Sequence, residues 1–241
     1  MIEELSVFRV IIGFAFMGYA SYSDIKTREI YDFVWYAMGI IGIIFIAIEI
    51  IFGYFLPLNF IFSLFFGIML GMLLHKFNFG GADVKAIIAL AILFPIFPNL
   101  TLFGVEFPIT GIPLINIFIL SIVTNSLIIG LFSPIYIFIH NLLKMEISPY
   151  MFIGYNVDIM KLKEMQHIRF VHNIDFETGK CEFIWGGIEL DENGVYELEK
   201  MAQKNILNRV WITPELPFIV YIMLGLIATI FYGDIIYSLM H

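Results

Sequence analysis

Two aspartates in short polar segments are the residues best suited to carry out a reaction. Asp24 closes one long apolar stretch, and Asp83 comes directly before another. Two facing carboxyl groups can hydrolyse an amide without a metal: the ionised one takes a proton from water, and the protonated one donates to the carbonyl oxygen. Because nearby carboxyls resist ionising together, they share a proton and titrate as a pair. Asp24 and Asp83 are therefore candidate acid and base, provided that the fold brings them together.

The elements that must position these acids are apolar stretches of transmembrane length. Of the 241 residues, 60% are hydrophobic and 14% are charged, against about 25% charged in soluble domains. One helical crossing of a bilayer takes about 20 apolar residues. The apolar stretches cover residues 5–23, 31–55, 57–74, 84–98, 112–143 and 214–240. They predict an all-α polytopic membrane protein with about six transmembrane helices, the fifth running beyond the bilayer or kinking near Pro134.

A polar segment between the fifth and sixth stretches predicts a small cytoplasmic α+β domain. Two strand-like runs, 167–176 and 181–185, flank a turn at 177–180, and residues 197–205 are typical of a polar helix. We therefore expect three parts. They are a membrane domain over residues 1–143 that carries both aspartates, a soluble domain over 144–210, and a last transmembrane helix over 211–241.

The basic residues predict how the chain is oriented in the cell membrane. Lys and Arg favour the cytoplasmic ends of membrane helices. With the N-terminus outside, six crossings place all but one of the 13 Lys and Arg residues inside, the exception being Arg9. The short inner segments hold Lys26, Arg28, Lys76 and Lys85. In this multi-pass arrangement both aspartates and the soluble domain lie on the cytoplasmic side.

Two glycines before Asp83 predict a tight turn. Gly80 and Gly81 allow the backbone to turn sharply and a second chain to approach it closely. Taken alone, a Gly-Gly pair is more often a plain connecting turn, and an aspartate such as Asp24 more often marks a helix end. The shared membrane face of the two acids, together with their flanking sequences, favours the functional interpretation.

Those flanking sequences resemble archaeal type IV prepilin-like peptidases, the group of Gly-x-Gly-Asp aspartic peptidases that contains the preflagellin peptidases. The first motif is DIKTREI, which starts at Asp24 and is followed by Asp32 and Trp35. The second is FGGADVK at residues 79–85, which is similar to the family's Gly-x-Gly-Asp loop. Further matches are WITPELP at residues 211–217 and the pair Gly233-Asp234. The likeness covers nearly the whole chain.

The resemblance implies an aspartic endopeptidase. Its catalytic residues would be Asp24 and Asp83, with Gly80, Gly81 and Ala82 in the active-site loop. Its partners would be precursor proteins with short basic signal peptides, cut just before their apolar helix at the cytoplasmic membrane face. No cofactor is implied, because the chain lacks the four-cysteine insert of bacterial relatives and any Gly-rich cofactor loop.

Ala82 departs from the family pattern, because it stands where the motif has its second glycine. A hydrophobic residue at this place is typical of the euryarchaeal prepilin peptidases. Ala82 therefore favours pilin-like precursors as substrates, with flagellin precursors as the alternative.

Three other acids receive weaker interpretations. Tyr31-Asp32 with the second motif is similar to the acid pair of presenilin-type intramembrane proteases, where both acids lie deep inside long apolar helices. Asp32 is therefore a minor candidate for the first acid. Glu49 is an intramembrane ionisable group, for which we expect a snorkelling or packing role. Asp234 receives no role from the sequence.

Neither a metal site nor a nucleic-acid partner is expected. One cysteine, Cys181, cannot build a multi-cysteine zinc site or an internal disulfide, and His167 and His172 match no zinc signature. Basic tracts and nucleic-acid motifs are missing from the sequence. The competing class is a non-enzymatic transporter or filament-assembly scaffold. A transporter more often shows inverted repeats with broken helices, and no repeat is recognisable here.

Overall fold

The computed structural model describes residues 2–77, 79–165, 167–176, 180–215 and 217–240. The chain folds into two units, which are described separately. The helical unit comprises Met1–Gly130 and Pro217–His241, and the sheet unit comprises Leu131–Leu216.

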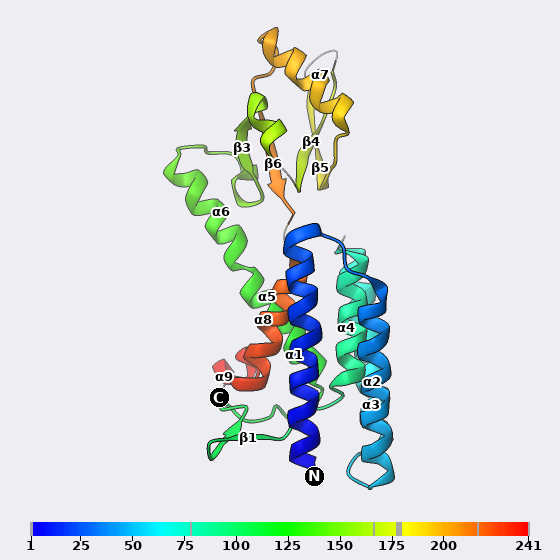
Figure 1. The fold of residues 1–241 in the computed structure, drawn as a ribbon. Helices are drawn as coiled ribbons and strands as arrows, with labels where there is room; N and C mark the ends of the chain where they lie inside the picture. The colour runs from blue at the N-terminus through cyan, green and yellow to red at the C-terminus, as the bar shows by residue number, and fades with distance from the viewer. Residues whose placement is uncertain (1, 78, 166, 177–179, 216, 241) are drawn as a thin grey trace. The chain divides into compact units, whose positions relative to one another are not determined.

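The helical unit consists of seven described helices and one hairpin (Figure 1). They are α1 (Ile2–Thr27), α2 (Asp32–Ile51), α3 (Pro57–Lys76), α4 (Gly81–Leu93), β1 (Leu100–Leu102), β2 (Val105–Phe107), α5 (Phe118–Gly130), α8 (Phe218–Phe231) and α9 (Ile235–Met240). The N-terminus and the β1–β2 hairpin lie at one end of this unit, and the C-terminal end of α1 lies at the other.

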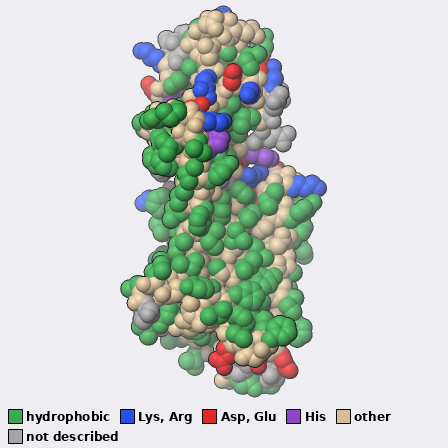
Figure 2. Space-filling view, turned by 90° about the vertical axis from the view of Figure 1, so that its left-hand side faces the viewer, with side chains coloured by type: hydrophobic (Ala, Val, Ile, Leu, Met, Phe, Trp, Pro, Cys, Tyr) green, Lys and Arg blue, Asp and Glu red, His purple; other side chains and the backbone are tan. Residues whose placement is uncertain are grey.

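This is a membrane protein. The segments Glu3–Thr27, Asp32–Ile51, Pro57–Lys76 and Phe118–Leu143 are long and apolar enough to cross a bilayer. Hydrophobic side chains cover most of the helical unit's face in Figure 2. The predicted crossings at 84–98 and 214–240 are shorter than expected. With 13 residues in α4 and 14 in α8, each helix rises about 20 Å, less than the roughly 30 Å of the hydrocarbon core.

The fifth apolar stretch breaks next to Pro134, as predicted. Proline lacks an N–H, and its ring clashes with the carbonyl four residues earlier, which here belongs to Gly130. Helix α5 ends at Gly130, and α6 begins at Phe132 and runs to Leu143. The break therefore follows directly from the proline.

The last apolar stretch is two helices, where a single helix was expected. The chain turns between α8 and α9 at Gly233, whose φ is +117°. A Cβ at Gly233 would lie 2.1 Å from Thr110 Oγ1, so only glycine fits there. The N–H of Ile109 donates to Phe231 O at 3.1 Å. The segment after β2 thus caps the end of α8 and replaces bonds that a continuous helix would make.

Helix α4 lies in the core of the helical unit because α2 and α3 approach it through glycines. A Cβ on Gly42 would lie 2.9 Å from the Cα of Leu93, and a Cβ on Gly67 would lie 2.5 Å from the Cβ of Ala91. Leu90 on α4 is fully buried. Such close packing leaves little freedom for α4 to shift, and so it fixes the position of the helix's first turn.

An ion pair is buried between α1 and α2. Arg9 Nη2 lies 3.0 Å from Glu49 Oε2, and both side chains are less than a tenth exposed. The guanidinium also lies over the ring of Phe45, 5.3 Å from its centroid. Glu49 therefore has a packing role, and a snorkelling role is wrong. Arg9, which stands apart from the other basic residues in the predicted topology, is its partner.

The sheet unit confirms the predicted small α+β fold. It contains α6, η1 (Pro149–Phe152), β3 (Tyr155–Asp158), η2 (Ile159–Glu164), β4 (Ile168–Ile174), β5 (Cys181–Ile188), α7 (Glu192–Gln203) and β6 (Arg209–Pro214). The strand order is β3-β6-β4-β5, with all neighbours antiparallel. Its core includes Ile159, Leu162, Leu198, Met201 and Ile212.

Three details of the sheet unit differ from the sequence prediction or extend it. Strands β4 and β5 match the two predicted strands, but residues 177–179 of the predicted turn lie outside the described residues. Helix α7 begins five residues earlier than expected, because Asp191 Oδ1 accepts from the N–H of Gly194 at 2.8 Å and caps it. Strand β6 runs from Arg209 to Pro214. Residues 211–214, which were expected to start the last transmembrane helix, therefore belong to this strand.

Candidate active site

Asp24 lies in the last turn of α1, where the helix is made to end. Arg28 follows with a φ of +58°, a left-handed conformation that a helix cannot continue through. The Ser23 hydroxyl donates to Glu29 O at 2.9 Å, and the Thr27 hydroxyl donates to Ser23 O at 3.0 Å. The Arg28 guanidinium comes within 4.0 Å of the Asp24 carboxylate. The local sequence thus holds Asp24 at a stable helix end.

Asp83 lies in the first turn of α4, and its carboxylate caps the helix that carries it. Asp83 Oδ2 accepts from the N–H of Gly80 at 2.9 Å. The helix starts at Gly81, so Gly81 and Ala82 are helical, and Gly80 has an ordinary φ of −64°. The two glycines therefore stand at the junction of the connection and the helix: Gly80 ends the connection from α3, and Gly81 is the first residue of α4.

The two glycines leave different kinds of space around Asp83. A Cβ on Gly80 would sit 3.3 Å from Asp83 Oδ2 and would press on the carboxylate. A Cβ on Gly81 would meet nothing within 4 Å. Gly81 is exposed, so a peptide can approach the backbone there.

The electrostatics link Asp83 to Asp24. Asp83 lies outside the four membrane-spanning segments, and its residue is 7% exposed. Burial raises the pKa of Asp83 to about 7, the Gly80 hydrogen bond opposes that rise, and the charge of Asp24 adds to it. The two acids are thus close enough to influence each other. A pKa raised toward neutrality is the property that a group donating and regaining a proton near pH 7 requires.

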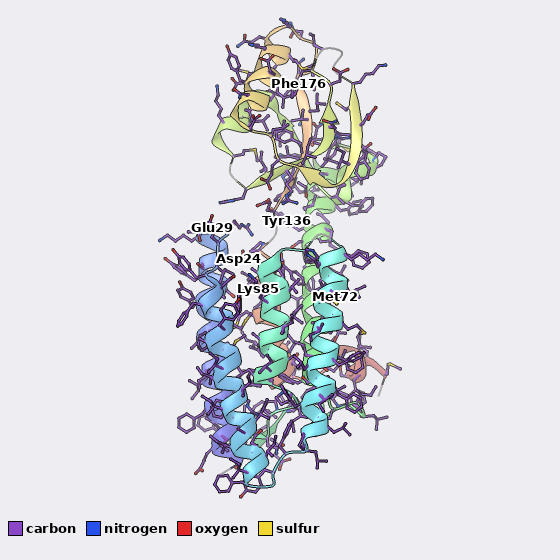
Figure 3. All side chains as sticks on the ribbon, turned by 90° about the vertical axis from the view of Figure 1, so that its right-hand side faces the viewer. Asp24, Glu29, Met72, Lys85, Tyr136 and Phe176 are labelled. Carbon is purple, nitrogen blue, oxygen red and sulfur yellow. The ribbon has the colours of Figure 1, made fainter. Side chains whose placement is uncertain are left out.

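The flanks of the two motifs also meet. Lys85 Nζ on α4 lies 2.6 Å from Asp32 Oδ1 in the first turn of α2, and both side chains are about half exposed. Asp24 and Lys85 lie at the same end of the helical unit (Figure 3). Asp32, the minor candidate for the first acid, is therefore engaged with Lys85. An exposed pair of this kind contributes little stability but joins α2 to α4.

An aromatic contact supports the loop before Asp83. The rings of Phe79 and Phe218 pack edge to face with centroids 4.5 Å apart. Phe218 is the first residue of α8 and is 9% exposed. This contact brings α8, from the far end of the sequence, to the residue before Gly80.

The remaining polar residues that the sequence singled out lie elsewhere. Asp234 accepts from the Ser121 hydroxyl at 2.6 Å and from the N–H of Tyr237 at 2.9 Å, so it joins α5 to the start of α9. His172 in β4 packs edge to face against Tyr150 at 4.4 Å, and burial lowers its pKa. Within the described part of the chain, no three His, Cys, Asp or Glu side chains are grouped to hold a metal ion.

Two family profiles match the chain. The profile of the type IV leader peptidase family covers residues 11–135, just over half of the chain, and includes both aspartates. A second profile, described as Archaeal Peptidase A24 C-terminus Type II, covers residues 147–235. The chain belongs to the type IV leader peptidase family. It is an aspartic-type endopeptidase, and the resemblance drawn from the motifs is confirmed.

Curated relatives of this peptidase carry the name preflagellin peptidase. The protein from Methanococcus voltae is 29% identical, over 95% of this chain and 96% of its own length. Those from Methanococcus maripaludis and Methanocaldococcus jannaschii are each 25% identical, over 93% of this chain. The alignments cover 94% and 93% of those two relatives.

Sequence reasoning missed two features of this site in the peptidase. The Asp32–Lys85 pair was not foreseen, although both residues lie inside the quoted motifs, and their opposite charges were the available signal. The sequence holds no signal for the Phe79–Phe218 contact. The chain has 26 phenylalanines, and nothing in the sequence shows which of them pack together.

Proposed function

We propose that this peptidase removes the signal peptides of type IV pilin-like and flagellin-type precursors, with Asp24 and Asp83 as its catalytic pair. The observation that carries the assignment of residues is the buried Asp83, whose pKa is raised to about 7 in part by Asp24. A carboxyl that stays partly protonated beside a second carboxyl is what two-acid hydrolysis requires. Gly80, Gly81 and Ala82 form the backbone over which the precursor passes.

The proposed reaction needs only water and the two carboxyls. Ionised Asp24 takes a proton from water, whose oxygen attacks the scissile carbonyl carbon, while protonated Asp83 donates to the carbonyl oxygen. The tetrahedral intermediate then collapses: the C–N bond breaks, Asp24 gives its proton to the leaving nitrogen, and Asp83 recovers a proton from the hydroxyl as the carbonyl reforms. Both acids return to their starting states.

Two observations bear on the natural precursor. The relatives named preflagellin peptidase match over nearly the full chain, which favours a flagellin-type precursor. Ala82 in the second motif favours a pilin-like precursor. We take the flagellin-type precursor as the first candidate, because the comparison draws on the whole chain and Ala82 differs from glycine by one methyl group.

We further propose the membrane arrangement of the chain. The N-terminus lies outside, and the six apolar stretches cross or enter the bilayer, with the short helices α4 and α8 packed inside. The membrane domain, residues 1–143, and the last segment, 211–241, would flank a cytoplasmic domain over 144–210. Support comes from the basic residues of the short inner segments.

Single substitutions test the catalytic pair. Asp24→Asn and Asp83→Asn should each reduce cleavage by several orders of magnitude. When two groups act as a unit, losing either one removes nearly all of their joint effect. The matched control is Asp32→Asn, which removes an acid at the same end of the unit and should keep most of the activity. Purified variants in liposomes would be incubated with one flagellin-type and one pilin-like precursor, and initial rates compared.

The same assay separates the parts of the proposal. Normal cleavage by Asp24→Asn or Asp83→Asn would refute the catalytic assignment. Faster cleavage of the pilin-like precursor by the unmodified peptidase would reverse the order of the two substrates and leave the mechanism intact.

A further inference from the structure

Phe218 stands out among the residues near the site because it reaches the second motif from the far end of the chain. Its ring packs edge to face on Phe79 at 4.5 Å, and the ring of Tyr221 lies 6.3 Å further along the same helix. Phe218 is 9% exposed and belongs to the main core of the helical unit, against which Phe79 packs. The rings of Phe79 and Phe218 carry no polar atom, so any role of these two residues in the reaction must be exerted through position.

The backbone around Phe79 explains why its position matters. The N–H of Phe79 donates to Leu74 O at the end of α3, at 3.1 Å. The next residue, Gly80, donates its N–H to Asp83 Oδ2 at 2.9 Å. Phe79 is therefore the fixed point from which the Gly80 N–H is aimed at the carboxylate. Glycine has no side chain of its own to anchor it, so the Phe79 ring is the side chain that anchors this segment beside its backbone hydrogen bonds.

We propose that Phe218 is a positioning residue for Asp83: its ring holds Phe79, and Phe79 aims the Gly80 N–H at the Asp83 carboxylate. This inference rests on the proposed function, in which Asp83 is the acid of the pair. Edge-to-face aromatic packing favours one ring orientation, and a catalytic group misplaced by about 1 Å can lose about 100-fold in rate. In this inference Phe218 acts on Asp83 only through Phe79 and Gly80.

Loss of the Phe218 ring should change the pKa of Asp83 in a specific direction. The hydrogen bond from Gly80 stabilises the ionised form of Asp83 and so opposes the rise of its pKa, whereas burial and the charge of Asp24 on α1 promote it. Lys85, the cation nearest in sequence, is engaged with Asp32 of α2. A weakened Gly80 bond therefore moves the titration of Asp83 to higher pH. General loosening of the fold would lower activity without this shift.

The test compares Phe218→Ala with Phe231→Ala across a pH series in liposomes. Phe231 is a matched control, because it lies at the other end of α8 and also packs edge to face, on Phe107 at 5.4 Å. For Phe218→Ala we expect kcat to fall at least about tenfold, KM to change little, and the limb of the pH profile near 7 to move to higher pH. Phe231→Ala should keep the unmodified profile.

Two further variants complete the experiment. Phe79→Ala should show the same kcat and the same shifted limb as Phe218→Ala, and the double variant should be no worse than either, because both act through one contact. An unmoved limb in Phe218→Ala, equal losses in Phe218→Ala and Phe231→Ala, or additive losses in the double variant would overturn the inference. Asp83→Asn runs alongside: full activity there would refute the catalytic assignment on which the inference rests, a result separate from these three.

Discussion

At the scale of single residues, Asp83 is subject to influences that change its pKa in opposite directions. Its carboxylate accepts from the Gly80 N–H, which favours the ionised form, while its burial and Asp24 favour the protonated form. Burial prevails, and the pKa rises. A surface aspartate in a helix's first turn has an ordinary or lowered pKa, so the raised value depends on where α4 is packed.

The raised pKa of Asp83 predicts two pH dependences. In the proposed reaction Asp83 donates a proton, so we expect the cleavage rate to fall as pH rises through about 7. In folding, a raised pKa means that the folded state holds the proton more tightly than the unfolded one. The contribution of Asp83 to stability should therefore be fully present below about pH 4 and be lost as pH rises to about 7 and above.

Thermal unfolding in detergent at several pH values checks the second dependence. The decline between pH 4 and 7 should be smaller in Asp83→Asn, whose side chain does not titrate. An identical decline in the two proteins would show that other groups are responsible.

Substitutions at Ala82 test how large a side chain fits beside Asp83. It lies in the first turn of α4, with ordinary helical backbone, so Ala82→Gly should fold and cleave much as before and cost about 0.4–1 kcal/mol of stability. Ala82 is only partly buried beside Asp83, and Ala82→Leu should displace the turn and slow cleavage by about 100-fold. Cleavage rates measured beside melting temperatures distinguish the two effects. An unchanged rate in Ala82→Leu would show that the turn yields without moving Asp83.

At the scale of elements, the sequence predicted where apolar stretches lie better than where helices begin and end. The start of α4 was placed at residue 84, but the helix begins at Gly81 because Asp83 caps it from within its own first turn. The break at Pro134 was predictable because proline acts locally. The break at Gly233 was not, since the groups that cap α8 come from the segment after β2.

The site was predictable to a similar extent. Both aspartates lie at one end of the helical unit, as positive-inside reasoning and the motifs led us to expect. The segment before Asp83 is held by α3 and α8, and such distant contacts leave no periodic signal in the sequence.

The packing of α5 against α8 gives a prediction at this scale. A Cβ on Gly225 of α8 would lie 2.0 Å from Ser126 Oγ and 2.7 Å from Ile122 O on α5. The Ser126 side chain can rotate, but the carbonyl of Ile122 cannot, so Gly225→Ala should force the helices apart and cost about 1–3 kcal/mol. The matched control is Gly18→Ala on α1, where a Cβ meets nothing within 4 Å.

Denaturation of both glycine variants in the same detergent provides the measurement. Gly18→Ala should leave stability unchanged or raise it by up to about 1 kcal/mol, since alanine is the better helix former. Equal effects of the two substitutions would mean that α5 and α8 are not held this closely.

At the scale of the whole molecule, the single cysteine offers a direct test of orientation. Cys181 lies exposed in β5 of the sheet unit. We expect a membrane-impermeant maleimide to label it in inverted membrane vesicles and not in intact cells. Neighbouring atoms still desolvate the sulfur in part and raise the pKa of this thiol, so labelling should be run at about pH 8.5, where more thiolate is present.

A second labelling site makes the orientation test two-sided. Leu114, between β2 and α5, is 93% exposed and lies at the outer end of the fifth apolar stretch in the proposed topology, before α5 begins at Phe118. In a Cys181→Ser background, Leu114→Cys should be labelled in intact cells. Labelling of Cys181 in intact cells would reverse the proposed topology.

The hydrogen bonds between α5 and the end of α8 have a consequence for synthesis of the chain. Asn125 donates to Thr229 Oγ1 and to Gly233 O, at 2.9 and 2.8 Å, and these partners lie 104 and 108 residues later. At about 5–20 residues per second, the ribosome needs roughly 5–20 s to reach them. During that interval the amide of Asn125 lacks these two partners, and an unpaired polar group is costly in lipid. Between the synthesis of α5 and that of α8, the nascent peptidase therefore carries an amide whose final partners have yet to be made.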